Sequence, residues 1–247
     1  MKDVMILTGA GQIGMAIARR MGYGMKIVVG DKKIENAQTI SKIMNEAGFD
    51  AVPVEMDLSS RDSIINMIAE ARKYGEISML VNAAGVSPSQ APIETILKVD
   101  LYGTAVLLEE VGKIIKEGGV GVTISSQSGW RMPALTAEED ELLATTPTEE
   151  LLNLPLLQPK NIRDTLHAYQ MAKRCNEKRV MAEAVKWGKE AQELRPGDVV
   201  VIPAEVKHWH GAAPDSWFAH LAVEVPGEDT SNEWCEAVSD EEYATLK

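Results

Sequence analysis

One stretch near the start of the chain decides the fold, Leu7-Thr8-Gly9-Ala10-Gly11-Gln12-Ile13-Gly14. It follows the apolar run of residues 4–7 and opens a helical pattern. The G-x-G-x-x-G spacing predicts a strand, a tight turn and a helix that cradles a dinucleotide pyrophosphate. We expect Gly9 to make the turn, Gly11 to let the backbone approach the phosphates, and Gly14 to let the helix pack closely. Free N–H groups at the helix N-terminus would face the anion.

The context of these glycines separates a nucleotide loop from an ordinary glycine turn. A second apolar run, residues 26–30, ends at Asp31. This is close to the spacing expected for the acidic residue that binds the adenosine ribose. The pair of strands therefore favours dinucleotide binding.

Composition and charge exclude several classes of protein. The 247 residues carry a formal net charge of -12, which argues against nucleic acid and anionic membranes as partners. No apolar run has the length of a membrane span, and the N-terminus lacks a signal-peptide pattern. Cys175 and Cys235 are the only cysteines, which favours a reduced, cytoplasmic protein over a disulfide scaffold.

Apolar runs and helical periods alternate through the first 189 residues, which predicts a doubly wound parallel α/β sheet. Further strands are expected at residues 51–56, 77–81 and 120–124, and helices at residues 33–47, 61–74 and 93–116. Ligands bind at the carboxyl ends of such strands. Four polar residues directly follow strands: Asp31, Asp57, Asn82 and Ser126.

The pattern lapses over residues 131–165, which hold four prolines among acidic residues and leucines. This segment is too long for an ordinary connection. Three interpretations are open: a lid over the site, with short helices seeded by Leu142-Leu143 and Leu151-Leu152, a poorly ordered insertion, or a surface excursion that packs on a neighbouring subunit.

The helix expected over residues 166–187 carries Tyr169 and Lys173, which lie four apart on one face. An ammonium close to a phenol favours the phenolate form, which suits the phenol to proton transfer. Ser126 is placed to hydrogen-bond a substrate oxygen beside that phenol.

Together these motifs resemble the short-chain dehydrogenase/reductase family over residues 1–189. The resemblance implies Tyr169 as general acid/base, Lys173 as its electrostatic partner and ribose ligand, and Ser126 as the group that orients the substrate. Asp31 would favour NAD over NADP, since a carboxylate repels a 2′-phosphate. The cofactor residues so implied are Gly9, Gly11, Gln12, Ile13, Gly14, Asp31, Asp57, Leu58, Asn82, Ala83, Ala84, Gly85, Tyr169 and Lys173.

This chain departs from the family in three places. Asp100 stands where the family usually has Asn, so a carboxylate there would alter the proton-relay water. The spacing from Ser126 to Tyr169 is lengthened by residues 131–165. The family's usual continuation after the Tyr169 helix is missing.

Residues 192–247 resemble instead the C-terminal half of a small cupin, with residues 194–211 as its second motif. The first cupin motif is absent, so we predict no metal site, although His208 and His210 would point to one face of a strand. Half a barrel leaves unpaired edges. We expect residues 199–202 to add to the dehydrogenase sheet as a surrogate sixth strand, or to pair with another copy.

The sequence therefore predicts an NAD-dependent oxidoreductase that transfers a hydride between the nicotinamide and a small carbonyl or secondary alcohol. Family resemblance implies a homodimer or larger homo-oligomer. Two alternatives stay open: a catalytically impaired dinucleotide-binding or assembly protein from a fused or truncated gene, and a metal-binding cupin-like activity of the tail.

Overall fold

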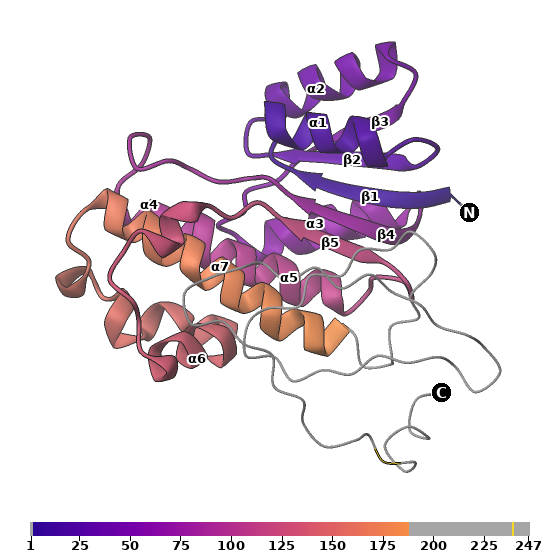
Figure 1. Ribbon diagram of the computed structural model, residues 1–247. Coiled ribbons are helices and arrows are strands. Elements are labelled where there is room, and N and C mark those ends of the chain that lie inside the picture. Colours follow the sequence, from indigo (N-terminus) through magenta and orange to yellow (C-terminus); the bar gives the residue numbers. More distant parts are fainter. Residues whose placement is uncertain (1, 188–238, 240–247) are drawn as a thin grey trace, which may run out of the picture. The chain divides into compact units, whose positions relative to one another are not determined.

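The computed structural model describes residues 2–187 and residue 239. The predicted cupin-like segment and its surrogate strand at residues 199–202 lie outside the described residues. Five parallel strands form one sheet in the order β3-β2-β1-β4-β5 (Figure 1). Their bounds are β1 Lys2–Thr8, β2 Lys26–Asp31, β3 Asp50–Glu55, β4 Gly75–Asn82 and β5 Val120–Thr123. The predicted doubly wound parallel sheet is confirmed.

Helices connect successive strands and cover both faces of the sheet. In chain order they are α1 Gln12–Met21, α2 Ile34–Glu46, α3 Arg61–Arg72, α4 Ile93–Ile96, α5 Thr104–Gly112, α6 Ala137–Thr145 and α7 Thr165–Trp187. Short helical turns are η1 Leu97–Gly103, η2 Gln127–Trp130, η3 Thr148–Asn153, η4 Pro155–Leu157 and η5 Pro159–Asn161. Strand β1 lies at the centre of the sheet, and its alternate residues pack into the two apolar cores on opposite faces. Val4 and Ile6 pack with α3 and α5, whereas Met5 and Leu7 pack with α1 and α2.

The long helix expected over residues 93–116 is present from Ile93 to Gly112, but it is not α-helical throughout. Residues 97–103 form a π-helical stretch between two α-helical pieces, and α5 ends at Gly112. A π-helical turn inserts an extra residue into a helix without breaking it, so hydrophobic periodicity does not reveal it. The turn carries Asp100, whose side chain is fully buried.

The proline-rich insertion folds against its own chain, beside α7 (Figure 1). It forms α6 and the three short turns η3 to η5. Leu143 and Leu151 are fully buried in a cluster that includes Met171 and Ala172 of α7. These leucines of the insertion are therefore buried within the chain, and the interpretations of the segment stay predictions.

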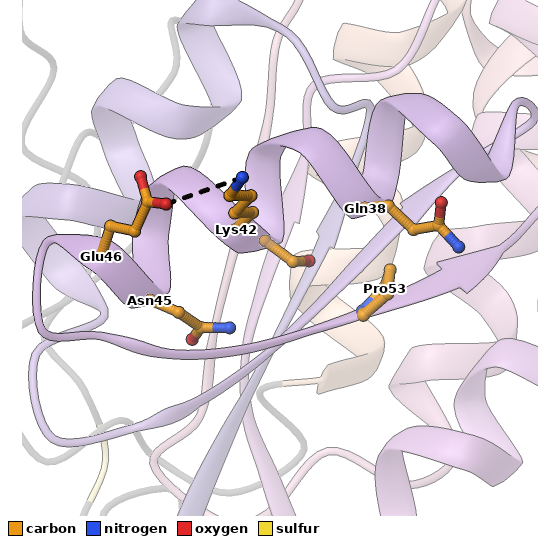
Figure 2. Close-up of a pocket in the computed structure, with 6 residues that line it drawn as sticks. Gln38, Lys42, Asn45, Glu46 and Pro53 are labelled. Carbon is orange, nitrogen blue, oxygen red and sulfur yellow. Dashed lines mark ion pairs between the residues drawn. The ribbon is translucent and has the colours of Figure 1, made fainter.

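The outer edge of the sheet at β3 is closed by a side chain of α2. Asn45 accepts a hydrogen bond from the Ala51 N–H at 2.7 Å and donates one to the Ala51 carbonyl at 2.9 Å. Pro53, next along the same edge, has no N–H to offer. Asn45 and Pro53 line a pocket of about 510 Å³, together with Gln38 and the Lys42–Glu46 ion pair. Figure 2 shows these side chains around the pocket. This pocket contains none of the predicted site residues.

Candidate active site

The glycine loop has the geometry that its spacing predicts. Gly9 adopts a φ of 85°, and a side chain there would lie 2.6 Å from the backbone N of Ala84. A side chain at Gly14 would lie 2.9 Å from the Gly9 carbonyl oxygen, so the helix packs closely on the turn. At Gly11, by contrast, an added Cβ would meet nothing within 4 Å. Open space therefore lies at the loop position where a ligand would approach.

The N-terminus of α1 borders this space. Gly11 caps the helix without a side-chain hydrogen bond. Gln12 is exposed, and Ile13 exposes 59% of its surface although it is apolar. Backbone N–H groups of a first helical turn have no partner within the helix, and they carry its positive dipole end. The arrangement fits a pyrophosphate.

Asp31 joins the end of β2 to the glycine loop. Its Oδ2 accepts the Ala10 N–H at 3.0 Å, and its Oδ1 accepts the Lys33 N–H at 2.9 Å. The Asn36 amide also donates to Oδ1 at 3.2 Å. The carboxylate is thus fixed beside the loop, and carboxylate oxygens have further lone pairs for a ribose hydroxyl.

Asp57 follows β3 and holds the neighbouring lysine. Lys32 Nζ lies 2.8 Å from its carboxylate, and Ser59 donates to it through both its backbone N–H and its hydroxyl. Burial disfavours the charged form, but these partners together lower the pKa of Asp57. The side chain of Leu58 points away into the core, where only 4% of the residue is exposed. Sequence alone did not reveal that orientation.

The segment after β4 is fixed by buried polar contacts. Thr8 donates its hydroxyl to Asn82 Oδ1 at 2.7 Å, and Asn82 Nδ2 donates to Thr104 Oγ1 at 3.2 Å. Ala84 packs against Gly9, so this segment forms a wall of the glycine loop. Thr104 was not predicted, although it stands one helical turn after Asp100.

Asp100 and Lys173 form a buried ion pair at the centre of the site. The Asp100 Oδ2 lies 3.4 Å from Lys173 Nζ, and their side chains are 0% and 6% exposed. Asp100 Oδ1 accepts the Val86 N–H at 2.7 Å, while Lys173 donates to the Ile124 carbonyl at 3.3 Å. Burial raises the pKa of the Asp100 carboxyl, an effect that the Lys173 ammonium opposes. The pair links η1, α7 and the end of β5.

Tyr169 lies one helical turn before Lys173 on α7. The Lys173 Nζ lies 5.3 Å from the centroid of the Tyr169 ring. The phenol ring is half-buried at the margin of the cluster that the insertion completes. The structure therefore brings Tyr169, Lys173 and Asp100 together.

The two serines after β5 have different environments. Ser126 caps η2, and its hydroxyl accepts the Ser128 N–H at 3.2 Å. Ser125 donates to the Lys173 carbonyl at 3.0 Å. Gly129 packs on the backbone of Arg174, which fixes η2 against α7. Ser125 thus anchors the helix that carries Tyr169. The sequence did not predict this role for Ser125.

Comparison with known proteins identifies the family. Residues 3–137, more than half of the chain, match the family described as short chain dehydrogenase. The chain belongs to the short-chain dehydrogenase family. Its members are oxidoreductases that generally use nicotinamide cofactors, act on small molecules and are typically oligomeric.

Three relatives show how far the similarity extends. The short-chain dehydrogenase/reductase bsc3 of Alternaria brassicicola is 34% identical over 207 residues, which cover 80% of this chain and 73% of that protein. An (R)-mandelonitrile lyase of Granulicella tundricola is 42% identical over 60 residues, which cover 24% of this chain and 46% of the lyase. A mutant short-chain dehydrogenase/reductase of Serratia marcescens has a similar fold, with a TM-score of 0.50 at 18% identity over 70% of this chain and 62% of that one.

No helix among the described residues is long and apolar enough to cross a membrane. Within the same residues there is no group of three or more His, Cys, Asp or Glu side chains suited to a metal. His208 and His210 fall outside the described residues, and their predicted lack of metal stays a prediction.

Proposed function

We propose that this chain is an NAD-dependent oxidoreductase that interconverts a small carbonyl compound and a secondary alcohol. The observation that carries the proposal is the buried Lys173. Its ammonium is fixed between Asp100 and the Ile124 carbonyl, one helical turn from Tyr169. This arrangement lies at the carboxyl end of the parallel sheet, where ligands of such folds bind.

Different residues at this end of the sheet would bind different parts of the dinucleotide. The free N–H groups of Gln12 and Ile13 would hold the pyrophosphate, and Asp31 would accept hydroxyls of the adenosine ribose. Asp57 and the segment from Asn82 to Gly85 would border the adenosine half. Lys173 would hold the second ribose with the donors that Asp100 and Ile124 leave free.

Proton transfer would belong to Tyr169. A bound nicotinamide supplies or accepts the hydride. During reduction, Tyr169 would give its phenolic proton to the carbonyl oxygen, and during oxidation it would take the proton of the alcohol. A positive charge beside the ring would favour the phenolate left by that transfer. Ser126 would orient the reacting oxygen.

Two features would favour NAD over NADP: the carboxylate of Asp31 and the ion pair of Lys32 with Asp57. A 2′-phosphate would meet the Asp31 carboxylate, and Lys32, the adjacent cation, is drawn to Asp57 at 2.8 Å. We expect NADH to bind more tightly than NADPH. Replacing Asp31 by Ser should narrow or reverse that preference.

The decisive test is Tyr169→Phe, assayed for reduction of a carbonyl panel and for NADH binding by nicotinamide fluorescence. The proposal predicts that hydride transfer falls by at least about 100-fold while saturable NADH binding survives. Leu166→Ala, an exposed position on the same helix, is the matched control. Undiminished turnover in the Phe variant would overturn the mechanism.

A further inference from the structure

The buried partner of Lys173 is a carboxylate, so the site carries one more negative charge than it would with an amide at position 100. Asp100 and Lys173 together carry no net charge when both are ionised, whereas a lysine beside an amide keeps its full positive charge. Coulombic attraction acts strongly where water is excluded, and both side chains are almost fully buried. The positive field that Lys173 exerts at the Tyr169 ring, 5.3 Å away, is therefore opposed by Asp100.

The position of the Asp100 carboxylate is closely defined. Its Oδ1 is held by the Val86 N–H. Its Oδ2 has no hydrogen-bond partner, but it faces the ammonium. An added Cβ at Gly85 would lie 3.1 Å from Oδ2 and 3.3 Å from Oδ1, so the carboxylate lies on the side of Gly85 where a side chain would stand.

Other charges near the pair are few among the described residues. The segments of residues 82–92 and 124–130 contain no charged side chain. On α7, Arg174 is paired with Asp140, and Glu177 accepts a hydrogen bond from Ser125 at 3.3 Å. Glu94 of α4 and Lys98 of η1 are exposed. Asp100 is thus the buried anion that pairs with Lys173.

We propose that Asp100 is a positioning residue that neutralises Lys173 and so holds Tyr169 in its protonated, proton-donating form. This inference rests on the proposed function, because it assigns the proton transfer to Tyr169. It implies that the site favours carbonyl reduction near neutral pH and needs a higher pH for alcohol oxidation. An amide at position 100 would instead let the ammonium favour the phenolate.

The test is Asp100→Asn in the full-length chain, with tyrosinate absorbance measured against pH without cofactor. Subtracting the curve of the matching Tyr169→Phe variant isolates Tyr169 from the other four tyrosines. The Tyr169 phenolate should form at a lower pH in Asp100→Asn than in wild type, by about one pH unit, or tenfold in proton affinity. Identical curves would overturn the inference.

Two further variants keep the test decisive. Asp140→Asn removes another partly buried carboxylate that pairs with α7, through Arg174 and Lys178, and it should leave the Tyr169 curve unchanged. An equal shift in that control would also contradict the inference. If Asp100→Asn does not fold, Asp100→Ala removes the same charge and should shift the curve in the same direction.

The absorbance experiment is independent of turnover. Where a substrate is found, half-maximal alcohol oxidation should also move to lower pH in Asp100→Asn. Absence of turnover, or a Tyr169→Phe variant that keeps full activity, would refute the proposed function. Phenolate formation would still decide whether Asp100 controls Tyr169.

Discussion

Gly9 and Gly11 stand two residues apart in one loop. A side chain would overlap the neighbouring backbone at Gly9 but would have free space at Gly11. Gly9 has a φ of 85° and contacts the backbone of Ala84, whereas space around Gly11 is open. Gly9→Ala should lower the free energy of unfolding by at least about 2 kcal/mol, through strain and overlap. Gly11→Ala should cost less, about 0.5–1 kcal/mol, because the added methyl meets no atom and the loss comes only from a poorer helix N-cap. Urea denaturation distinguishes the two, and equal losses would contradict the loop geometry.

Glu109 stabilises the insertion in a pH-dependent manner. Burial disfavours its charge, but hydrogen bonds from Thr148, Arg61 and Lys113 lower its pKa to about 2, from an ordinary 4.5. A carboxyl whose pKa is lowered by folding adds stability above its unfolded pKa, and this is lost as pH falls towards the folded value. Wild type should therefore lose more stability than Glu109→Gln between about pH 5 and about pH 3. Equal losses in urea titrations would show that these contacts contribute nothing.

Burial protects the single cysteine of α7. Cys175 is fully buried and its pKa is raised to about 12, mainly by burial, so the reactive thiolate is scarce at neutral pH. Alkylation followed by peptide mass spectrometry should leave Cys175 unmodified in the native protein and modify it in urea. Rapid native labelling would contradict the packing of α6 on α7.

At the scale of elements, the two edges of the sheet differ. The β3 edge is closed by Asn45, so Asn45→Ala leaves a partly buried N–H and carbonyl of Ala51 without their partner. We expect a loss of about 1–2 kcal/mol in the free energy of unfolding. Gln38→Ala, an exposed position on the same helix, serves as control and should have almost no effect. A neutral Asn45→Ala would show that the edge needs no such closure.

The β5 edge of the sheet differs from the β3 edge, because no side chain of the described residues is seen to close it. Val120 and Val122 are 43% and 42% exposed, and among the described residues β5 pairs only with β4. The sequence prediction that residues 199–202 add a sixth strand concerns this edge and stays a prediction. Hydrogen exchange of the full-length chain tests it. Amides of residues 199–202 should be as protected as those of β5, and rapid exchange would contradict the pairing.

At the scale of the whole molecule, the sequence predicted the sheet because apolar runs and helical periods alternate clearly. The same regularity placed Asp31, Asp57 and Asn82 at the carboxyl ends of strands. Features that depend on tertiary contact were not predictable. The ion pair of Asp100 with Lys173 joins residues 73 positions apart, and the inward turn of Leu58 depends on packing.

The packing of the insertion also depends on tertiary contact and was not predictable from the sequence. Its leucines indicated short helices, but not which surface they cover. The structure shows that they complete the apolar cluster beside α7, which carries Tyr169 and Lys173. Glu149 of η3 further ties the insertion to Arg61 of α3 at 2.7 Å. The insertion thus supports the helix that bears the proposed proton donor.

We expect the glycine loop and the strand ends to form a working dinucleotide site in this chain. The most direct test of this expectation is a titration of the purified full-length protein with NADH and, separately, with NADPH, followed by nicotinamide fluorescence. Saturable binding with NADH preferred is the predicted result. Binding of neither nucleotide would show that the loop and the strand ends form no dinucleotide site.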